Sequence, residues 1–120
     1  MPSHYHLEVR IMNDQQPVVV STSVDQEEAA TSIARRVLGE RLAACVHIHP
    51  PMTSLYWWKG EIASDSEYLL SMKSDRTLFE RLIKTIRSVH PYEVPEIIAV
   101  DIVDVDREYA AWMREELDHG

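Results

Sequence analysis

The chain has few of the residues that cross-link or loosen a backbone: 1 cysteine, 3 glycines and 6 prolines among 120 residues. One cysteine cannot form an internal disulfide bond, so a reducing, cytoplasmic location is expected. Three glycines cannot supply a glycine-rich phosphate loop. Neither the Gly-x-Ser-x-Gly elbow of hydrolases nor the His-Glu-x-x-His motif of zinc proteases occurs. The sequence therefore offers no catalytic constellation, and we expect a protein that is not an enzyme.

Long apolar runs and clusters of basic residues are also absent. No apolar stretch approaches the length that spans a membrane, and the N-terminus lacks the basic and apolar segments of a signal peptide. The formal net charge of −8 repels a phosphate backbone. We therefore expect neither a membrane nor a nucleic acid as a partner, and the charge is typical of a soluble surface.

What is present fits one domain over residues 1–120, with 45% hydrophobic and 27% charged residues. Residues 1–16 are the least certain part of that domain. His4–Met12 alternates loosely, and Asn13–Pro17 has the composition of a turn. The segment is therefore interpreted as an N-terminal arm or as one strand of a hairpin.

The first half of the chain predicts a strand, a helix and a hairpin. Val18–Thr22 is a short apolar run, and Asp25 with Glu28 has the spacing of a capping box for a helix that ends near residues 41–44. The other predicted strands, separated by prolines and by a glycine turn, are Cys45–His49, Met52–Lys59 and Glu67–Lys73.

The second half predicts a helix, a strand and a last helix. Ser74 or Asp75 is expected to cap an amphipathic helix that ends before the two X-Pro bonds of residues 90–95. Ile97–Val105 is apolar on both faces, so both faces should be covered. Asp104 or Asp106 is expected to cap the last helix. The order β-α-β-β-α-β predicts an α+β, ferredoxin-like sandwich with an extra C-terminal helix.

Three neighbouring aromatic residues predict an oligomer. Tyr56, Trp57 and Trp58 alternate between the two faces of a strand, so they cannot all enter one core. A ferredoxin-like sheet has helices on one face, and its other face would expose apolar side chains. Exposed apolar surface of that extent usually marks an interface, here with copies of the same chain.

Three motifs in fixed order carry a family resemblance. They are Leu42-Ala43-Ala44-Cys45-Val46, Ser54-Leu55-Tyr56-Trp57-Trp58-Lys59-Gly60 and His90-Pro91-Tyr92-Glu93-Val94-Pro95-Glu96. Together with a final Tyr109-Ala110-Ala111-Trp112, they resemble the CutA family of divalent-cation tolerance proteins over roughly residues 18–117. The resemblance implies a compact homotrimer linked to tolerance of divalent metal ions. It also implies weak copper binding, because some members bind copper with cysteine and histidine.

Cys45 and His90 are the metal candidates. Cys45 shares a strand face with His47 and His49, and a thiolate with two imidazoles suits copper or zinc. The alternative is a buried small cysteine beside two surface histidines. The resemblance places a copper-associated histidine at His90, although Ser21 and its neighbours lack a cysteine that some relatives have. The alternative role of His90 is to stabilise the end of a helix.

A second group of candidate residues is polar and aromatic. In CutA-like trimers the equivalent motif positions cluster around clefts between subunits, where a small anionic or zwitterionic ligand could bind. The same residues could instead form salt bridges that hold subunits together. The candidates for this ligand cleft are Tyr56, Lys59, Glu67, Lys73, Tyr92, Glu93, Glu96 and Trp112. By analogy of fold, the alternative function is that of a small-molecule sensor similar to the PII-type trimers.

Overall fold

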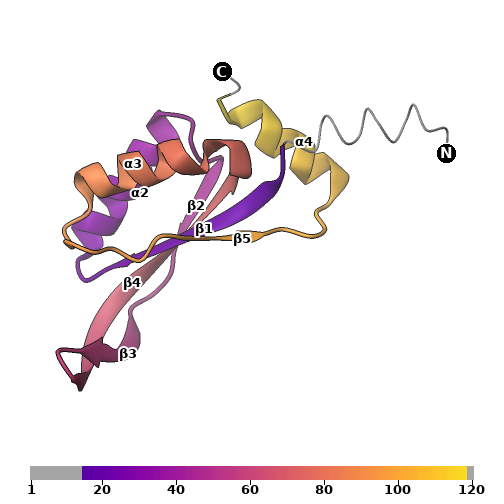
Figure 1. Cartoon of the computed structure of the whole chain (residues 1–120). Coiled ribbons are helices and arrows are strands. Elements are labelled where there is room, and N and C mark those ends of the chain that lie inside the picture. Colours follow the sequence, from indigo (N-terminus) through magenta and orange to yellow (C-terminus); the bar gives the residue numbers. More distant parts are fainter. Residues whose placement is uncertain (1–14, 119–120) are drawn as a thin grey trace.

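The computed structural model describes residues 15–118, so nearly all of the N-terminal arm considered above lies outside the described residues. Figure 1 shows the order of the elements along the chain. They are β1 (Pro17–Val24), α2 (Glu27–Gly39), β2 (Cys45–Ile48), β3 (Met52–Trp58), β4 (Glu61–Asp75), a 3₁₀ turn (Arg76–Leu78), α3 (Phe79–Val89), β5 (Ile98–Asp101) and α4 (Arg107–Glu116).

The strands form one antiparallel sheet in the order β2-β4-β1-β5, with β3 pairing to the remaining part of β4. Strand β4 lies between β1 and β2 and is antiparallel to both, so β1 and β2 run in the same direction. This is the split β-α-β arrangement of a ferredoxin-like fold. The predicted fold class is therefore confirmed, including the extra helix at the C-terminus.

The core lies on one face of this sheet. Helices α2 and α3 pack side by side there, as Figure 1 shows. Alternate residues of the strands point toward them, and Val20 pairs with Met72 at the centre of the buried face. The other core residues include Val18, Val24, Ile33, Val37, Leu70, Leu82 and Ile86.

The opposite face of the sheet is only partly covered. It carries the alternate residues of the same strands, such as Val19, Ile98 and Val100. The prediction that both faces of a strand over Ile97–Val105 are covered is wrong for the single chain. The strand is confined to Ile98–Asp101, and all of its residues are exposed. An apolar sequence predicts that a strand is covered, but not whether its own chain covers it.

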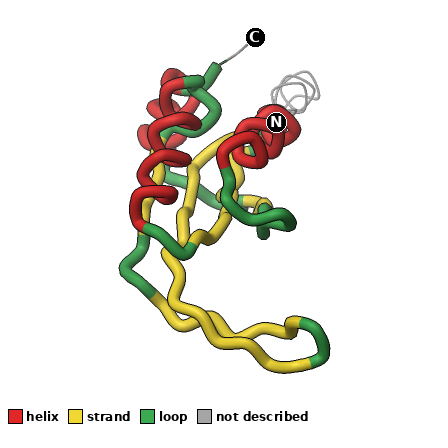
Figure 2. Tube along the Cα trace, turned by 90° about the vertical axis from the view of Figure 1, so that its left-hand side faces the viewer, coloured by secondary structure: helices red, strands yellow, loops and turns green. Residues whose placement is uncertain are grey.

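The β3–β4 hairpin projects away from the helices and turns aside from the rest of the sheet (Figures 1 and 2). Its tip is a tight turn in which Lys59 and Gly60 both have positive φ, 50° and 80°, which matches the twist of a two-residue hairpin. Strand β4 is longer than the predicted Glu67–Lys73, because the polar residues before Glu67 also pair with β3. That early stretch has no strand-like apolar pattern, so only the pairing reveals it.

The helix caps agree with prediction in two cases out of three. Helix α2 begins after Gln26 without a side-chain cap, so the predicted role of Asp25 is wrong. Asp75 accepts a hydrogen bond from the Thr77 amide and caps the turn that leads into α3. Asp106 accepts from the Tyr109 amide and caps α4.

Removing the Asp75 cap should lower stability. The carboxylate accepts from both the amide (2.9 Å) and the hydroxyl (2.6 Å) of Thr77. Loss of a helix cap costs about 1 kcal/mol. We therefore expect Asp75→Ala to lower the midpoint of thermal unfolding, whereas Asp104→Ala, at an exposed acidic residue, should leave it nearly unchanged. Equal effects of the two substitutions would contradict the assigned cap.

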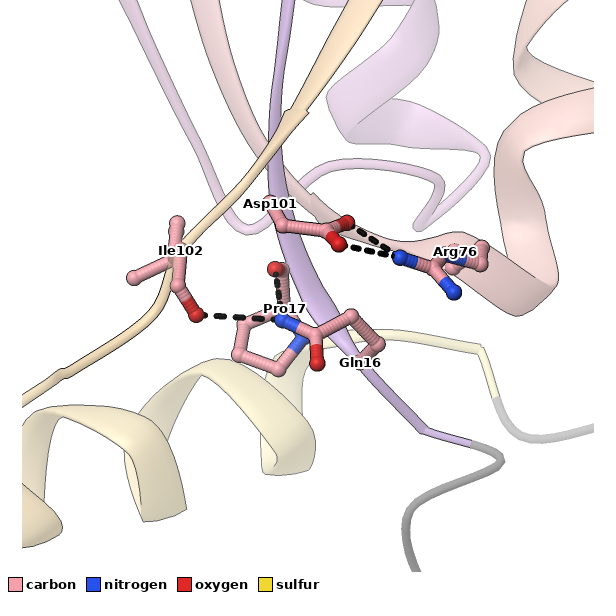
Figure 3. A network of polar contacts seen from close by, with 5 residues as sticks. All are labelled: Gln16, Pro17, Arg76, Asp101 and Ile102. Carbon is pink, nitrogen blue, oxygen red and sulfur yellow. Dashed lines mark hydrogen bonds and ion pairs between the residues drawn. The ribbon is translucent and has the colours of Figure 1, made fainter.

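A network of polar contacts fastens β5 to the start of β1 (Figure 3). The Gln16 side-chain amide donates to the carbonyl of Ile102 at 3.0 Å, and the Ile102 amide donates to the Pro17 carbonyl at 3.0 Å. The Arg76 guanidinium binds both oxygens of the Asp101 carboxylate. These contacts hold the last strand at the edge of the sheet although its side chains are exposed.

Candidate functional site

Two groups of side chains carry chemistry in this fold, and they lie at different places on the sheet. The first is on the partly covered face, where Cys45 opens β2 opposite Lys73. The Cys45 sulfur lies 3.6 Å from Nε2 of His47. The His49 ring instead meets the Ser71 hydroxyl at 2.8 Å. The three residues therefore share a face, as the spacing predicts, but only Cys45 and His47 approach each other.

The surroundings of Cys45 are set by the ends of two helices. Helix α2 ends in a turn in which Arg41 has φ 57°, and the Leu42 amide returns to the Val37 carbonyl. Arg41 also binds Glu116, which draws the end of α4 to this turn. Cys45 follows directly and is partly buried, not fully buried as its position in the sequence predicts.

Tyr109 of α4 completes this neighbourhood. Burial raises the pKa of its phenol, and the charge of the Cys45 thiolate and a hydrogen bond to Cys45 raise it further. Tyr109 also packs against Trp112 with ring centroids 5.4 Å apart. Helix α4 thus places an aromatic pair beside the thiol, at the end of the sheet away from the hairpin (Figure 1).

The second group surrounds His90, which ends α3 as its C-cap. His90 is buried, and its Nε2 lies 3.0 Å from the Ser23 carbonyl oxygen and 3.1 Å from the Thr22 hydroxyl. Its Nδ1 accepts a hydrogen bond of 3.0 Å from the backbone amide of Tyr92. Both ring nitrogens are therefore occupied, and neither offers a lone pair to a metal ion in this conformation.

Glu67 and Tyr92 extend this group. The Tyr92 hydroxyl donates to the Glu67 carboxylate at 2.7 Å, and the Ser23 hydroxyl donates to the same oxygen at 3.5 Å. Burial raises the pKa of Tyr92 well above its usual range, and its hydrogen bond to Glu67 adds to the effect. The tyrosine therefore stays protonated and acts as a donor.

The eight residues considered for a ligand cleft do not form one cluster within a single chain. Of these, Glu67 and Tyr92 are in contact. Tyr56 instead donates to Asp65, which raises the pKa of the phenol. Lys59 lies over the Trp58 ring at the hairpin tip, 5.6 Å from its centroid. The others are spread over β4, the segment before β5, and α4: Lys73, Glu93, Glu96 and Trp112.

Cys45 and His90 are likewise not brought together. Cys45 pairs with Lys73, which in turn pairs with Val19 of β1, whereas His90 binds Ser23 of the same strand. Ser23 lies roughly 13 Å further along β1 than Val19. Among residues 15–118, no group of three or more His, Cys, Asp or Glu residues is arranged to hold a metal ion. Any metal bound by one chain would have at most two such ligands from this part of it.

Sequence reasoning missed three residues that the structure places in these groups: Thr22, Ser23 and Asp65. The backbone carbonyl of Ser23 and the hydroxyl of Thr22 bind the His90 ring. No sequence motif identifies groups of this kind. Asp65 could have been found, because it shares a strand face with Glu67 at a spacing of two residues. That spacing is informative only once β4 is known to extend as far as Asp65.

Comparison with known proteins identifies the family. The family model described as "CutA1 divalent ion tolerance protein" matches residues 18–116. A Thermus thermophilus protein named "Divalent-cation tolerance protein CutA" is 46% identical over 97 residues, which cover 81% of this chain and 94% of that protein. The chain belongs to the CutA1 family of divalent ion tolerance proteins.

A further relative and a solved structure show the same similarity. Human "Protein CutA" is 46% identical over 89 residues, which cover 74% of this chain and 50% of the human protein. The chain therefore spans about half the length of that relative. A solved structure, the divalent cation tolerance protein from Thermus thermophilus, superposes with a TM-score of 0.83 at 44% identity and covers 85% of this chain and 99% of that one.

Within the described part of the chain, no helix has both the length and the apolar character needed to cross a membrane.

Proposed function

We propose that this chain is a non-catalytic, cytoplasmic protein of divalent metal tolerance that assembles as a homotrimer and binds copper weakly. Membership in the CutA1 family supports the link to divalent ions. The observation that carries the metal part is the approach of Cys45 and His47. A free thiol in the chain supports the cytoplasm, where thiols stay reduced.

Uncovered apolar surface supports the assembly. Leu55, Trp57 and Ile62 lie on one face of the hairpin, because Trp57 pairs directly with Ile62 and Leu55 precedes it by two residues. Their exposed fractions are 70%, 73% and 65%. Soluble proteins rarely leave such a group open to water unless it forms an interface. Copies of the same chain would cover both this patch and the face of β5.

The Cys45–His47 pair supports weak copper binding. A thiolate and an imidazole on one strand are soft and borderline ligands that suit copper. Within residues 15–118 one chain supplies no third ligand of this kind beside them, so water or a neighbouring copy would complete the coordination, and the affinity is expected to be low. His90 is outside this proposed site because its ring nitrogens are already bonded.

Native mass spectrometry of the purified protein titrated with copper(II) and zinc(II) tests the proposal. We expect a trimer that takes up copper, with uptake reduced at least about tenfold by Cys45→Ser or His47→Gln, since each removes one of two ligands. His49→Gln is the matched control, because His49 lies on the same strand face but binds Ser71. It should leave uptake unchanged.

A trimer that stays free of copper, or uptake that survives both ligand substitutions, would overturn the metal part of the proposal. A monomer would overturn the assembly. The hydrogen-bonded pair of Glu67 and Tyr92 supports the alternative, a sensor of small molecules in clefts between subunits. For that function, candidate metabolites should raise the unfolding temperature of the metal-free trimer, and Tyr92→Phe should abolish the rise.

A further inference from the structure

The hydrogen bonds of His90 fix its protonation state. A backbone carbonyl can only accept, so Nε2, which faces the Ser23 carbonyl, must carry a hydrogen. A backbone amide can only donate, so Nδ1, which faces the Tyr92 amide, must carry a lone pair. The ring is therefore the neutral tautomer with its hydrogen on Nε2.

This arrangement leaves a single place for a second proton. An added proton would have to bind Nδ1, where the Tyr92 amide already points its hydrogen at 3.0 Å between the nitrogens. Two hydrogens cannot occupy that contact. Protonation of the ring therefore requires the Tyr92 amide to move away from His90.

Each group around the ring affects the balance between its neutral and charged forms. Burial lowers the pKa of His90 below its ordinary 6.5. The bond to Ser23 and the negative charges of Glu67, on β4, and Asp25, before α2, raise it, but by less than burial lowers it. The two carboxylates thus stabilise the charged form of the ring, while burial favours the neutral form.

We propose that His90 and Tyr92 form an acid-sensitive latch, in which protonation of the His90 ring at Nδ1 displaces the Tyr92 amide and so releases the segment between α3 and β5 from the ring. The latch consists of the Ser23 carbonyl, the His90 ring and the Tyr92 amide. When it is closed, the Tyr92 ring packs edge-on against His90 with centroids 4.9 Å apart, and its hydroxyl binds Glu67. Opening breaks the contacts of Tyr92 with Nδ1 and with Glu67 together, because one residue makes both, whereas Nε2 keeps its hydrogen and still donates to the Ser23 carbonyl.

Release would act on the edge of the sheet. The segment from Pro91 onward leads directly into β5, whose pairing with β1 begins at Ile98 opposite Ser21. Glu67 would lose its tyrosine donor and gain contact with water. The latch therefore links acidity to the position of the chain that enters the exposed edge strand.

The direction and size of the effect follow from the lowered pKa. In the open segment the Tyr92 amide no longer blocks Nδ1, whereas in the closed latch burial lowers the pKa of His90 and the ring stays neutral. Opening therefore becomes more favourable as the pH falls below about 6.5, by up to about tenfold for each pH unit, because only the open form can take up the second proton. Above about pH 6.5 the latch should be insensitive to pH.

Nuclear magnetic resonance of the full chain tests this inference. The His90 ring and the Tyr92 amide are followed together from about pH 8 to pH 5, and exchange of the Tyr92 amide with solvent is corrected for its intrinsic pH dependence. We expect both signals to change with one shared midpoint below about 6.5. We also expect the exchange protection of Tyr92 to fall by up to about tenfold per pH unit in that range.

His90→Gln is the informative variant, because glutamine can donate to the Ser23 carbonyl but does not titrate. It should make the protection of Tyr92 independent of pH, while His49→Gln, at an exposed histidine, should preserve the dependence. If His90→Gln does not fold, the shared midpoint in the unmodified chain remains decisive. A Tyr92 amide that does not respond while His90 titrates, or a His90 midpoint at or above about 6.5, would overturn the latch.

Discussion

Trp57→Ala is expected to convert the proposed trimer largely into monomers. Trp57 is the most exposed tryptophan of the hairpin, and it shares its face with Leu55 and Ile62. Large aromatic residues at the centre of an interface typically contribute about 2 kcal/mol or more. A loss of that size weakens each contact between copies roughly 30-fold. Sedimentation equilibrium over a range of protein concentrations measures the shift.

The neighbouring tryptophan provides the control. Trp58 points to the other face of the hairpin, beneath the Lys59 ammonium group. Trp58→Ala changes the same residue type at the same tip but should leave the trimer largely intact. Equal dissociation by both variants would show that the face of Leu55, Trp57 and Ile62 is not the contact surface. An intact trimer for Trp57→Ala at all concentrations would contradict this role for the hairpin.

Leu82→Ala is expected to cause a large loss of stability. Leu82 lies in the middle of α3 with 0% of its surface exposed. Replacing a buried leucine by alanine removes apolar contacts and leaves a cavity, at a cost of about 2–5 kcal/mol. The midpoint of thermal unfolding measures the loss, and it is compared at one protein concentration because the proposed assembly would make it depend on concentration.

An exposed residue of the same helix separates cavity formation from changes in helix propensity. Lys84 is exposed on α3, two residues after Leu82. Lys84→Ala should change the free energy of unfolding by less than about 0.5 kcal/mol. If Leu82→Ala were equally mild, helices α2 and α3 would not be packed around this side chain as the structure shows.

Much of the fold could be predicted because its elements have strong local patterns. Helix α3 combines an apolar stripe with the Asp75 cap before it, and both were recognised in the sequence. The extension of β4 to Glu61 could not be recognised, because its polar residues pair with β3 at the hairpin and bury little. The sequence also could not show whether the single chain covers β5, whose residues are all exposed there.

The candidate site was less predictable than the fold. Spacing placed Cys45 and His47 on one face correctly, because strand periodicity is strict. Spacing cannot show that His90 uses both ring nitrogens, since its partners are a carbonyl from β1 and the amide of Tyr92. The separation of His90 from Cys45 depends on strand register, and the sequence does not encode register in any single motif.

Strand β4 runs without a break from the tip of the hairpin to the centre of the core. Because successive side chains of a strand alternate, the number of residues between Glu61 and Leu70 fixes which way the tip faces. Adding one residue there would turn Leu55, Trp57 and Ile62 to the opposite side without changing any of them. Whether the number of residues in this stretch is odd or even thus decides which way the hairpin faces. Substitutions at the tip leave this orientation unchanged, whereas insertions within this stretch should preserve the proposed assembly only in even numbers.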